Sequence, residues 1–199
     1  MNNLDRALII FARKPELGKV KTRLAKSIGE EKALSVYIKL LNHTRTVAKQ
    51  LDYSTYVFLT EPTKNDFWKG FVCEIQQGNS LGEKMKFAFE ALFNKGYKQC
   101  VIIGSDCPGL TKEIIEEAFF NLVENDVAIG PAEDGGYYLL GMNKLIQPFF
   151  YNKIWSTDSV FKQTIKDIED LQLAYKILPV LNDVDEEKDI PVGWLKAME

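Results

Sequence analysis

The sequence predicts an α/β protein with a three-layer α/β/α architecture and a mostly parallel sheet. Short apolar runs, rich in β-branched and aromatic residues, alternate with longer segments whose apolar residues recur at helical spacing. This alternation is typical of a parallel sheet covered by helices on both faces. The 199 residues, 46% of them hydrophobic, are sufficient to bury one continuous core, so we expect a single domain over residues 1–199.

The predicted strands are short buried runs bounded by turn residues. The first five cover residues 7–12, 55–59, 71–75, 100–103 and 127–129. A further strand over residues 137–142 is expected to run antiparallel and to begin an irregular half of the sheet. A late strand is expected over residues 173–178, before a run of acidic residues.

Helices are predicted between these strands. Apolar residues form one stripe over residues 33–51 and another over residues 81–93, where Ser80 and Glu83 make a capping-box signature. A third helix follows Thr111, a residue that can cap it. A fourth is expected from Ser156 or Thr157 to about residue 168, and a short terminal helix over residues 189–197.

Composition excludes several classes of function. The formal net charge of -3 argues against general nucleic-acid binding, which usually needs a broad excess of Lys and Arg. No apolar run is long enough to span a bilayer and the start lacks the pattern of a signal peptide, so we expect a cytoplasmic protein without a membrane partner. The composition leaves homo-oligomerisation open.

The three cysteines do not predict a disulfide framework or a zinc site, because their number is odd and no C-x-x-C spacing occurs. We expect reduced thiols, with Cys100 in the core and Cys107 partly exposed. A catalytic cysteine would need a histidine partner. The one histidine, His43, lies in a predicted helix far along the chain, so a structural role is favoured.

A cluster of cations follows the first predicted strand. Its members are Arg13, Lys14, Lys19, Lys21 and Arg23. In open α/β sheets, ligands bind at the carboxyl ends of the strands, and Arg and Lys pair with phosphate oxygens there. Gly18 permits a tight turn, and Thr22 leads into a helix whose first N–H groups favour anions. The loop therefore predicts a polyphosphate site, although a solvated basic loop is the alternative. It matches neither the Walker A pattern nor G-x-G-x-x-G.

Carboxylates follow two later strands. Asp106 comes directly after the strand over residues 100–103, and Asp183 and Asp185 follow the late strand. Strand alternation would point these last two side chains to the same side. Mg²⁺ or Mn²⁺ often takes one or two carboxylates together with phosphate oxygens. We therefore predict a metal site at Asp106 with Asp183 or Asp185, slightly favouring Asp183; the alternative for Asp106 is a turn or a helix cap.

A third constellation contains Asp134, Gly135 and Gly136. Adjacent glycines permit close approach of the backbone to a ligand, and an acidic residue beside them can hold hydroxyl groups or act as a base. A plain turn is the alternative. Trp155 could add a stacking ring near the acceptor, or belong to the core.

The order of these motifs resembles a known group of proteins. The motifs are F-A-R-K-P-x-x-G-x-V-K-T-R-L, G-S-D-C-P-G-L, D-G-G-Y-Y-L-L-G, W-S-T-D and N-D-V-D-E-E-K-D. Together they resemble the GT-A-like bacterial family of uncharacterised nucleotide-diphospho-sugar transferases that includes arsenosugar-biosynthesis glycosyltransferases. The chain is more remotely similar to 2-phospholactate guanylyltransferase and to molybdenum cofactor nucleotidyltransferases. The resemblance implies a nucleotide-diphospho-sugar transferase fold, with a nucleotide over the first strand, loop and helix.

Two departures from related patterns bear on function. S-D-C stands where metal-dependent GT-A glycosyltransferases usually have D-x-D, and the G-G-x-G-x-R loop of sugar-nucleotide pyrophosphorylases is missing. K-T-R-L could do the same electrostatic work as that loop. The fold expectation survives both departures.

Three functions follow from these residues. The first is metal-dependent glycosyl transfer from a nucleotide sugar to a small-molecule acceptor, in which Arg13, Lys21 and Arg23 neutralise the leaving nucleotide and Asp134 orients or deprotonates the acceptor. The second is nucleotidyl transfer from an NTP to a phosphorylated small molecule, with release of pyrophosphate; five cations suit a triphosphate at least as well as a diphosphate. The third is nucleotide binding without turnover. The resemblance favours the first narrowly.

Overall fold

The structure, a computed structural model, describes residues 5–62, 66–155 and 157–195. Its strands are β1 (Arg6–Ala12), β2 (Ser54–Leu59), β3 (Val72–Ile75), β4 (Gln99–Ile103), β5 (Val127–Pro131), β6 (Tyr137–Met142) and β7 (Tyr175–Ile177). Within the described residues these form one sheet in the order β3-β2-β1-β4-β6-β5-β7. Most neighbours run parallel, whereas β6 is antiparallel to both β4 and β5. The predicted mostly parallel sheet with an antiparallel strand at residues 137–142 is confirmed.

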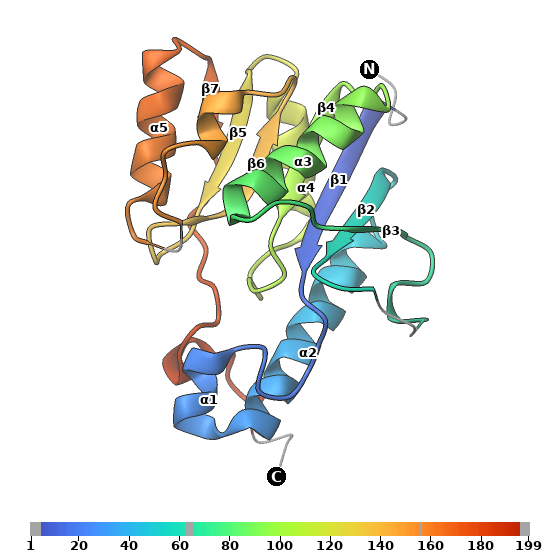
Figure 1. Cartoon of the computed structure of the whole chain (residues 1–199), viewed down its shortest axis with the longest axis vertical. Helices are drawn as coiled ribbons and strands as arrows, with labels where there is room; N and C mark the ends of the chain where they lie inside the picture. The colour runs from blue at the N-terminus through green and yellow to red at the C-terminus, as the bar shows by residue number, and fades with distance from the viewer. Residues whose placement is uncertain (1–4, 63–65, 156, 196–199) are drawn as a thin grey trace.

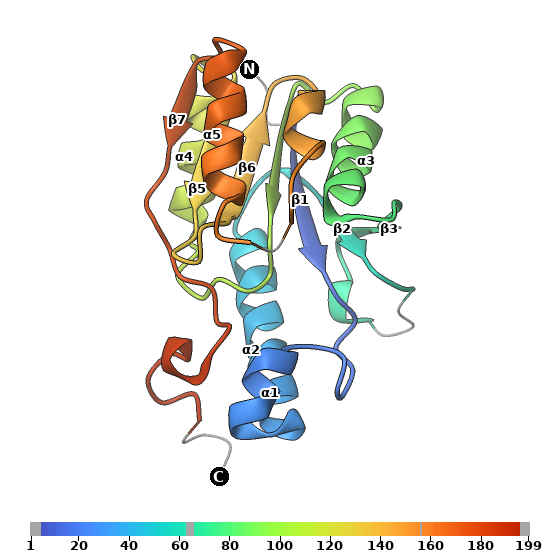
Figure 2. The ribbon, with the colours of Figure 1, turned by 60° about the vertical axis from the view of Figure 1, so that its left-hand side comes forward.

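Helices cover both faces of the sheet, as predicted (Figures 1 and 2). They are α1 (Thr22–Ile28), α2 (Glu30–Ala48), α3 (Leu81–Asn94), α4 (Lys112–Asn121) and α5 (Val160–Asp170), with short 3-10 turns η2 (Asp66–Trp68), η3 (Gln147–Phe150) and η4 (Glu187–Asp189). Residues of α2 and α4 pack on one face, and residues of α3, η3 and α5 pack on the other. None of the described helices is both long and apolar enough to cross a membrane.

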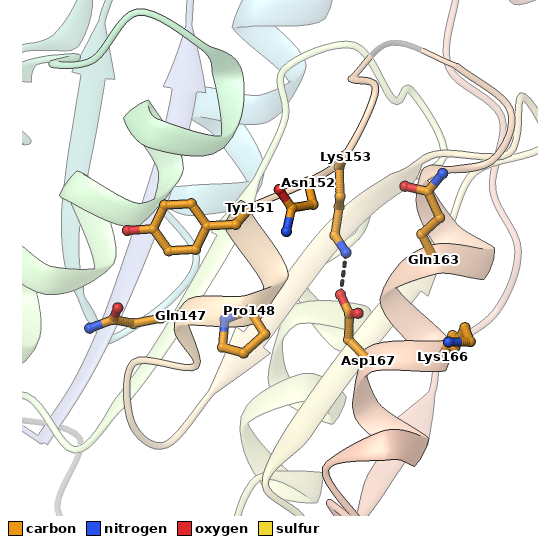
Figure 3. A pocket seen from close by; sticks show the side chains of 8 residues that line it. All are labelled: Gln147, Pro148, Tyr151, Asn152, Lys153, Gln163, Lys166 and Asp167. Atoms are coloured by element: carbon orange, nitrogen blue, oxygen red, sulfur yellow. Dashed lines mark hydrogen bonds and ion pairs between the residues drawn. The ribbon is translucent and has the colours of Figure 1, made fainter.

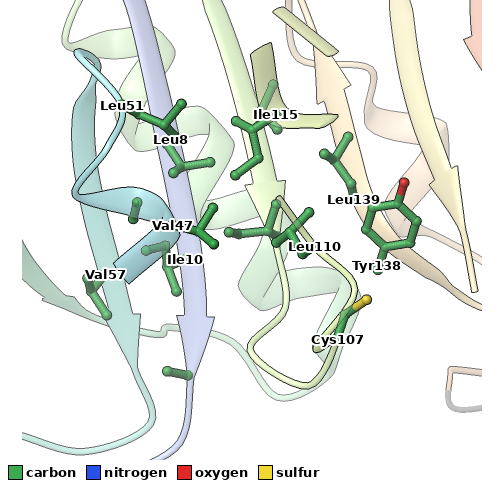
Figure 4. Packing of buried hydrophobic residues seen from close by; sticks show 14 of the residues in the cluster. Leu8, Ile10, Val47, Leu51, Val57, Cys107, Leu110, Ile115, Tyr138 and Leu139 are labelled. Carbon is green, nitrogen blue, oxygen red and sulfur yellow. The ribbon is translucent and has the colours of Figure 1, made fainter. Parts of the chain in front are cut away.

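The two apolar cores follow from strand alternation in β1. Leu8 and Ile10 point into the core with α2 and α4, while Ala7 and Ile9 point into the core with α3 and α5. Figure 4 shows the first core, where Leu110 from the loop after β4 lies among residues of β1, α2 and β6. Packing on both faces explains why the strand sequences are almost continuously apolar.

A third, smaller cluster lies beyond the carboxyl end of β1. There α1, the start of α2 and the segment after β7 lie side by side (Figures 1 and 2). Leu24 of α1, Leu40 of α2 and Val184 of the late segment are buried against one another. This packing brings residues near position 184 to the loop after β1, although about 160 residues separate them in the sequence.

Several predicted helix starts differ in detail from the structure. Ser80 Oγ accepts a hydrogen bond from the backbone N–H of Glu83 at 3.2 Å, but Glu83 Oε2 accepts from the N–H of Asn79 rather than from that of Ser80, so only half of the capping box forms. Thr111 occupies the N-cap position of α4 without a side-chain cap. The fourth helix begins at Val160, later than Thr157; Ser156 lies outside the described residues.

The predicted terminal helix is wrong for the described residues 189–195. The chain instead makes η4, and Asp189 Oδ2 accepts hydrogen bonds from the N–H groups of Asp185 and Glu186 at 3.2 and 2.8 Å. Those carboxylate bonds close a single turn, after which Pro191 follows. Residues 196 and 197 of the prediction lie outside the described part.

Two of the three cysteines are buried, and the histidine holds a loop in place. All three thiols are free, and Cys100 is buried as predicted. The expected partial exposure of Cys107 is wrong, because this residue of the loop after β4 is only 3% exposed and packs into the core. Burial raises the pKa of its thiol to about 12. His43 Nε2 lies 2.8 Å from the carbonyl oxygen of Leu110, so α2 holds that loop in place.

Candidate functional site

A cleft of about 790 Å³ lies at the carboxyl ends of β1 and β4. It falls within the range typical of ligand pockets. Its wall combines the loop after β1, the loop after β4, the turn before β6 and the segment after β7. Most residues predicted to bind or react line it: Arg13, Lys14, Lys21, Thr22, Arg23, Asp106, Asp134, Gly136, Trp155, Asp183 and Asp185.

Two predicted binding residues do not line the cleft. Gly18 has φ of 73° and makes the turn of the basic loop beside Glu30. Gly135 has φ of 85°, and a Cβ atom there would lie 2.2 Å from the carbonyl oxygen of Asp158. The loop therefore uses Gly135 to approach the start of α5, where Phe161 N–H donates to the Gly135 carbonyl at 2.9 Å, rather than to approach a ligand.

Lys21 is the central cation of the cleft. Its Nζ lies 2.9 Å from Asp106 Oδ2 and 3.4 Å from Asp185 Oδ1, and its side chain is only 5% exposed. Lys21 adopts the left-handed backbone conformation, φ 47°, immediately before α1, which turns the chain from the loop into the helix. A buried ammonium between two carboxylates is held much more firmly than a surface ion pair.

The other cations differ in how they are held. Arg23 Nη1 lies 3.4 Å from Asp185 Oδ2, and the Arg23 side chain remains 69% exposed. Lys14 and Lys19 both reach Glu16, at 3.5 and 2.8 Å. The cations of the loop thus surround the cleft from its floor to its rim.

Tyr37 of α2 fixes the start of the basic loop, a role that its place on an apolar helical stripe did not reveal. Its hydroxyl accepts from the N–H of Arg13 at 2.8 Å and donates to the Arg13 carbonyl at 3.1 Å. Burial, reinforced by the nearby Asp106 carboxylate, raises the pKa of Tyr37 to about 12. Tyr37 therefore stays a neutral hydrogen-bonding group at physiological pH.

Asp106 and Asp183 are joined through the backbone. Val184 N–H donates to the Asp106 carbonyl at 3.0 Å, and Leu181 N–H donates to the Pro131 carbonyl at 3.1 Å. The late segment therefore follows β5 and then crosses to the loop after β4. Because Val184 points into the small core, Asp183 and Asp185 on either side of it both reach the cleft, as alternation predicts.

The carboxylates of Asp106, Asp183 and Asp185 are not fully neutralised by the cations that contact them. Asp106 Oδ1 is buried without a hydrogen-bond partner among the described residues. Burial first, and then repulsion from Asp106, Asp134 and Asp185, raises the pKa of Asp183 to about 7, although Lys21 opposes the shift. The buried Asp183 carboxyl group, crowded by other carboxylates, and the unpartnered Asp106 Oδ1 are the oxygens here that could contact a divalent cation.

The oxygen ligands that the protein offers limit how a divalent ion could bind here. Over the part of the chain that the structure describes, no three His, Cys, Asp or Glu side chains are arranged to hold a metal. Asp106 and Asp183 could supply two oxygens to Mg²⁺ or Mn²⁺, ions that commonly complete their shell with phosphate oxygens and water. The residues present fit that mode of binding and do not fit a metal cage made by the protein alone.

The opposite side of the cleft carries polar and aromatic groups. Asp134 is exposed, and its Oδ1 accepts from the N–H of Gly136 at 2.8 Å. Trp155 is partly buried against α3, where a Cβ atom at Gly82 would lie 2.7 Å from its ring. Trp155 therefore packs against the core and also lines the cleft, and its stacking near an acceptor stays a prediction.

Gln76, at the end of β3, is a further cleft residue that sequence reasoning missed. Its Nε2 donates to the carbonyls of Phe58 and Ala12 at 2.9 and 3.4 Å. These bonds tie the ends of β1 and β2 together. The available signal was its position directly after a predicted strand, the same signal that identified Asp106.

Comparisons with known proteins agree with this architecture. A family model described as an uncharacterized protein conserved in bacteria, DUF2064, matches residues 43–157. A crystal structure from Desulfovibrio desulfuricans G20, provisionally described as a nucleotide-diphospho-sugar transferase, is 32% identical, with a TM-score of 0.87 over 92% of this chain and 83% of that chain. No curated protein matches the sequence.

More distant structures share the fold. The 4-diphosphocytidyl-2C-methyl-D-erythritol synthase of Anaerococcus prevotii DSM 20548 is 12% identical, with a TM-score of 0.60 over 100% of both chains. A CMP:2-keto-3-deoxy-manno-octonic acid synthetase, in complex with CTP, is 9% identical, with a TM-score of 0.61 over 97% of this chain and 98% of that chain.

Proposed function

The chain belongs to the DUF2064 family of uncharacterized bacterial proteins, and we propose that it is a transferase that uses a nucleotide-activated donor. The reaction we favour is glycosyl transfer from a nucleotide sugar to a small acceptor. One observation carries the proposal: a single cleft is lined by the five cations of the basic loop and by Asp106, Asp183 and Asp185. The similarity to a provisionally described nucleotide-diphospho-sugar transferase supports the same choice.

The basic loop would bind the diphosphate of the donor. Arg13 and Arg23 are exposed at the cleft, and Lys21 lies at its floor. Negative charge develops on the diphosphate as the bond to the sugar breaks, so fixed cations that face it stabilise the transition state more than the ground state. In this proposal Lys21 acts directly on the leaving group, and Arg13, Lys14, Thr22 and Arg23 bind the nucleotide.

A divalent ion would add to this charge when bound, by neutralising phosphate oxygens. Asp106 and Asp183 are the residues proposed to hold it, with Asp185 keeping Lys21 and Arg23 in place. The same three carboxylates repel one another, so they attract a cation and oppose an anionic ligand that arrives without one. Lys21 lowers that repulsion through its contact with Asp106.

Asp134 is proposed as the group that receives the acceptor proton. The acceptor oxygen would form a bond to the anomeric carbon while the bond from that carbon to the phosphate oxygen breaks and the nucleoside diphosphate leaves. Asp134 faces the cleft from the turn before β6, with Gly136 and Trp155 also in the wall. Gly136 N–H holds one oxygen of Asp134, which fixes the orientation of the carboxylate.

Nucleotidyl transfer is the second candidate, because the five cations that line the cleft suit a triphosphate at least as well as a diphosphate. In that reaction a phosphorylated acceptor would attack the α-phosphorus of an NTP, and pyrophosphate would leave. The charge of the cleft suits either donor, so the leaving group distinguishes the two reactions.

The test incubates the full chain and Mn²⁺ with sugar nucleotides or NTPs and with pooled hydroxylated and phosphorylated small molecules. Nucleoside diphosphate and pyrophosphate are measured separately, and the D106N variant is the matched control. Release of nucleoside diphosphate that depends on the acceptor and on Asp106 supports glycosyl transfer. Release of pyrophosphate supports the second candidate. Thermal stabilisation by nucleotides without either product would indicate a binding protein and overturn both.

A further inference from the structure

A second cavity, of about 620 Å³, lies between η3 and α5, apart from the cleft (Figure 3). Tyr151, Asn152 and Lys153 form one wall, and Gln163 and Asp167 of α5 form the other. The chain continues from this wall to Trp155 and Thr157, which line the cleft. Neighbouring parts of the chain therefore line the two cavities, and none of the residues that line the second belongs to the proposed reaction.

The charges in this cavity balance. Lys153 forms an ion pair with Asp167 across it, as Figure 3 shows, and the Lys153 side chain is only 2% exposed. Lys166 at the edge is paired with Asp170 at 3.2 Å. An uncompensated phosphate would find no free buried cation here, because removing Lys153 from Asp167 would leave the carboxylate unpaired. The chemistry therefore differs from that of the cleft.

The cavity has unused hydrogen-bonding capacity of both kinds. Gln163 Nε2 donates to Ser159 Oγ at 3.1 Å, but Gln163 Oε1 is buried and lacks a partner among the described residues. Gln147 and Asn152 bring two further amides, each with donors and an acceptor. The Lys153 ammonium has three N–H donors, and Asp167 Oδ2 is its partner in the described structure.

Tyr151 provides an aromatic surface at the rim. Its side chain is held from the direction of α3, because Lys86 Nζ lies 5.7 Å from the ring centroid, while the residue remains 46% exposed. An aromatic ring in a wall that also carries the amides of Gln147 and Asn152 can accept the apolar face of a ring that carries hydroxyl groups on its edge. This combination is suited to a ligand that is apolar on one face and polar around its edge.

We propose that this cavity binds a neutral molecule with vicinal hydroxyl groups, such as a saccharide or a cyclic polyol. Each hydroxyl both donates and accepts, so neighbouring hydroxyls can satisfy Gln163 Oε1 and a carboxylate oxygen of Asp167 while accepting from Lys153 and Asn152. A neutral ligand leaves the buried ion pair intact. The proposal concerns a site outside the cleft and does not depend on the reaction catalysed there.

The test is a titration of the isotope-labelled full chain, followed by NMR, with methyl α-D-glucopyranoside and with myo-inositol. Cyclohexanol serves as a ring without vicinal hydroxyls, and inorganic phosphate as an anion. We expect saturable shifts of the side-chain amide signals of Gln163 and Asn152 with methyl α-D-glucopyranoside, with myo-inositol or with both. Neither control should produce saturable shifts at those signals.

Asn152→Gly is the informative variant, because Asn152 has φ of 56°, which glycine adopts without strain. Loss of its hydrogen bond should weaken diol binding about three- to tenfold. Gln172→Gly is the matched control, since Gln172 has φ of 53° and lies outside the cavity. Absence of saturable shifts with both diols, equal binding of cyclohexanol or phosphate, or unchanged affinity in N152G would each overturn the proposal.

Discussion

The backbone N–H of Val184 donates a hydrogen bond to the carbonyl oxygen of Asp106 at 3.0 Å. This bond joins the loop after β4 to a segment 78 residues later, and it sets Asp183 beside Asp106. The separation of the cleft carboxylates is thus fixed by main-chain geometry and by the buried side chain of Val184, rather than by the carboxylates themselves. Substituting one carboxylate should therefore change the chemistry of the site more than its architecture.

Asp106→Asn should abolish metal-dependent turnover while leaving the fold close to wild-type stability. The amide keeps the shape of the side chain but removes the charge that faces Lys21 at 2.9 Å. Turnover and urea denaturation, measured on the same preparation, check both halves of the statement. Asp170→Asn is the control, since Asp170 is an exposed partner of Lys166 away from the cleft. Full activity in D106N would remove Asp106 from the metal site.

Arg23→Ala should raise the nucleotide dissociation constant. A charge-assisted hydrogen bond contributes about 1.5–3 kcal/mol, and because Arg23 is 69% exposed we expect the lower end, about tenfold. Calorimetric titration with nucleotides in the presence of Mn²⁺ measures the change. Lys26→Ala is matched to it, since Lys26 is an exposed cation of the same helix that does not line the cleft. Equal affinities in R23A and wild type would show that Arg23 does not contact the phosphates.

The sequence predicts the sheet and the position of Asp106 for the same reason. Strands that are buried on both faces have continuous apolar, β-branched sequences, which can be recognised. The residue that follows a parallel strand lies at the carboxyl edge of the sheet. Lys21 and Asp106 both follow such strands, so their meeting in the cleft could be inferred before any coordinates. Asp183 could be placed there as well, because it follows the late strand.

Other features depend on contacts that leave no periodic signal. Tyr37 belongs to an apolar helical stripe, and only the fold shows that its hydroxyl reaches the backbone of Arg13. The pair Gly135-Gly136 resembles a ligand-binding turn, but the approach of Asp158 that requires Gly135 arises from the packing of α5. A terminal helix is predicted over residues 189–197, and the carboxylate of Asp189 instead closes a single turn.

Asp183 should make stability depend on pH. In the unfolded chain its pKa is near 3.8, and burial with neighbouring carboxylates raises the folded pKa to about 7. Between these values the folded state binds more protons, so the contribution of Asp183 to the free energy of unfolding falls as pH rises from about 4 to 7. Denaturation in EDTA across this range, compared with Asp183→Asn, isolates the effect. As pH rises, the free energy of unfolding of wild type should fall relative to that of D183N. A difference that stays constant over this range would contradict the raised pKa of Asp183.

Gly135→Ala should destabilise the protein more than the loss of glycine at an open turn. The new Cβ would lie 2.2 Å from the Asp158 carbonyl oxygen, so the loop before β6 or the start of α5 must move. Gly96→Ala is the matched control, because Gly96 also has a positive φ, 97°, and has no atom within 4 Å of the added Cβ. In G96A the free energy of unfolding should fall only by the cost of placing alanine in the left-handed backbone conformation, about 1–2 kcal/mol. Urea denaturation should show a clearly larger loss of stability for G135A than for G96A. Equal losses for the two variants, with nucleotide affinity impaired only in G135A, would instead assign Gly135 to ligand binding.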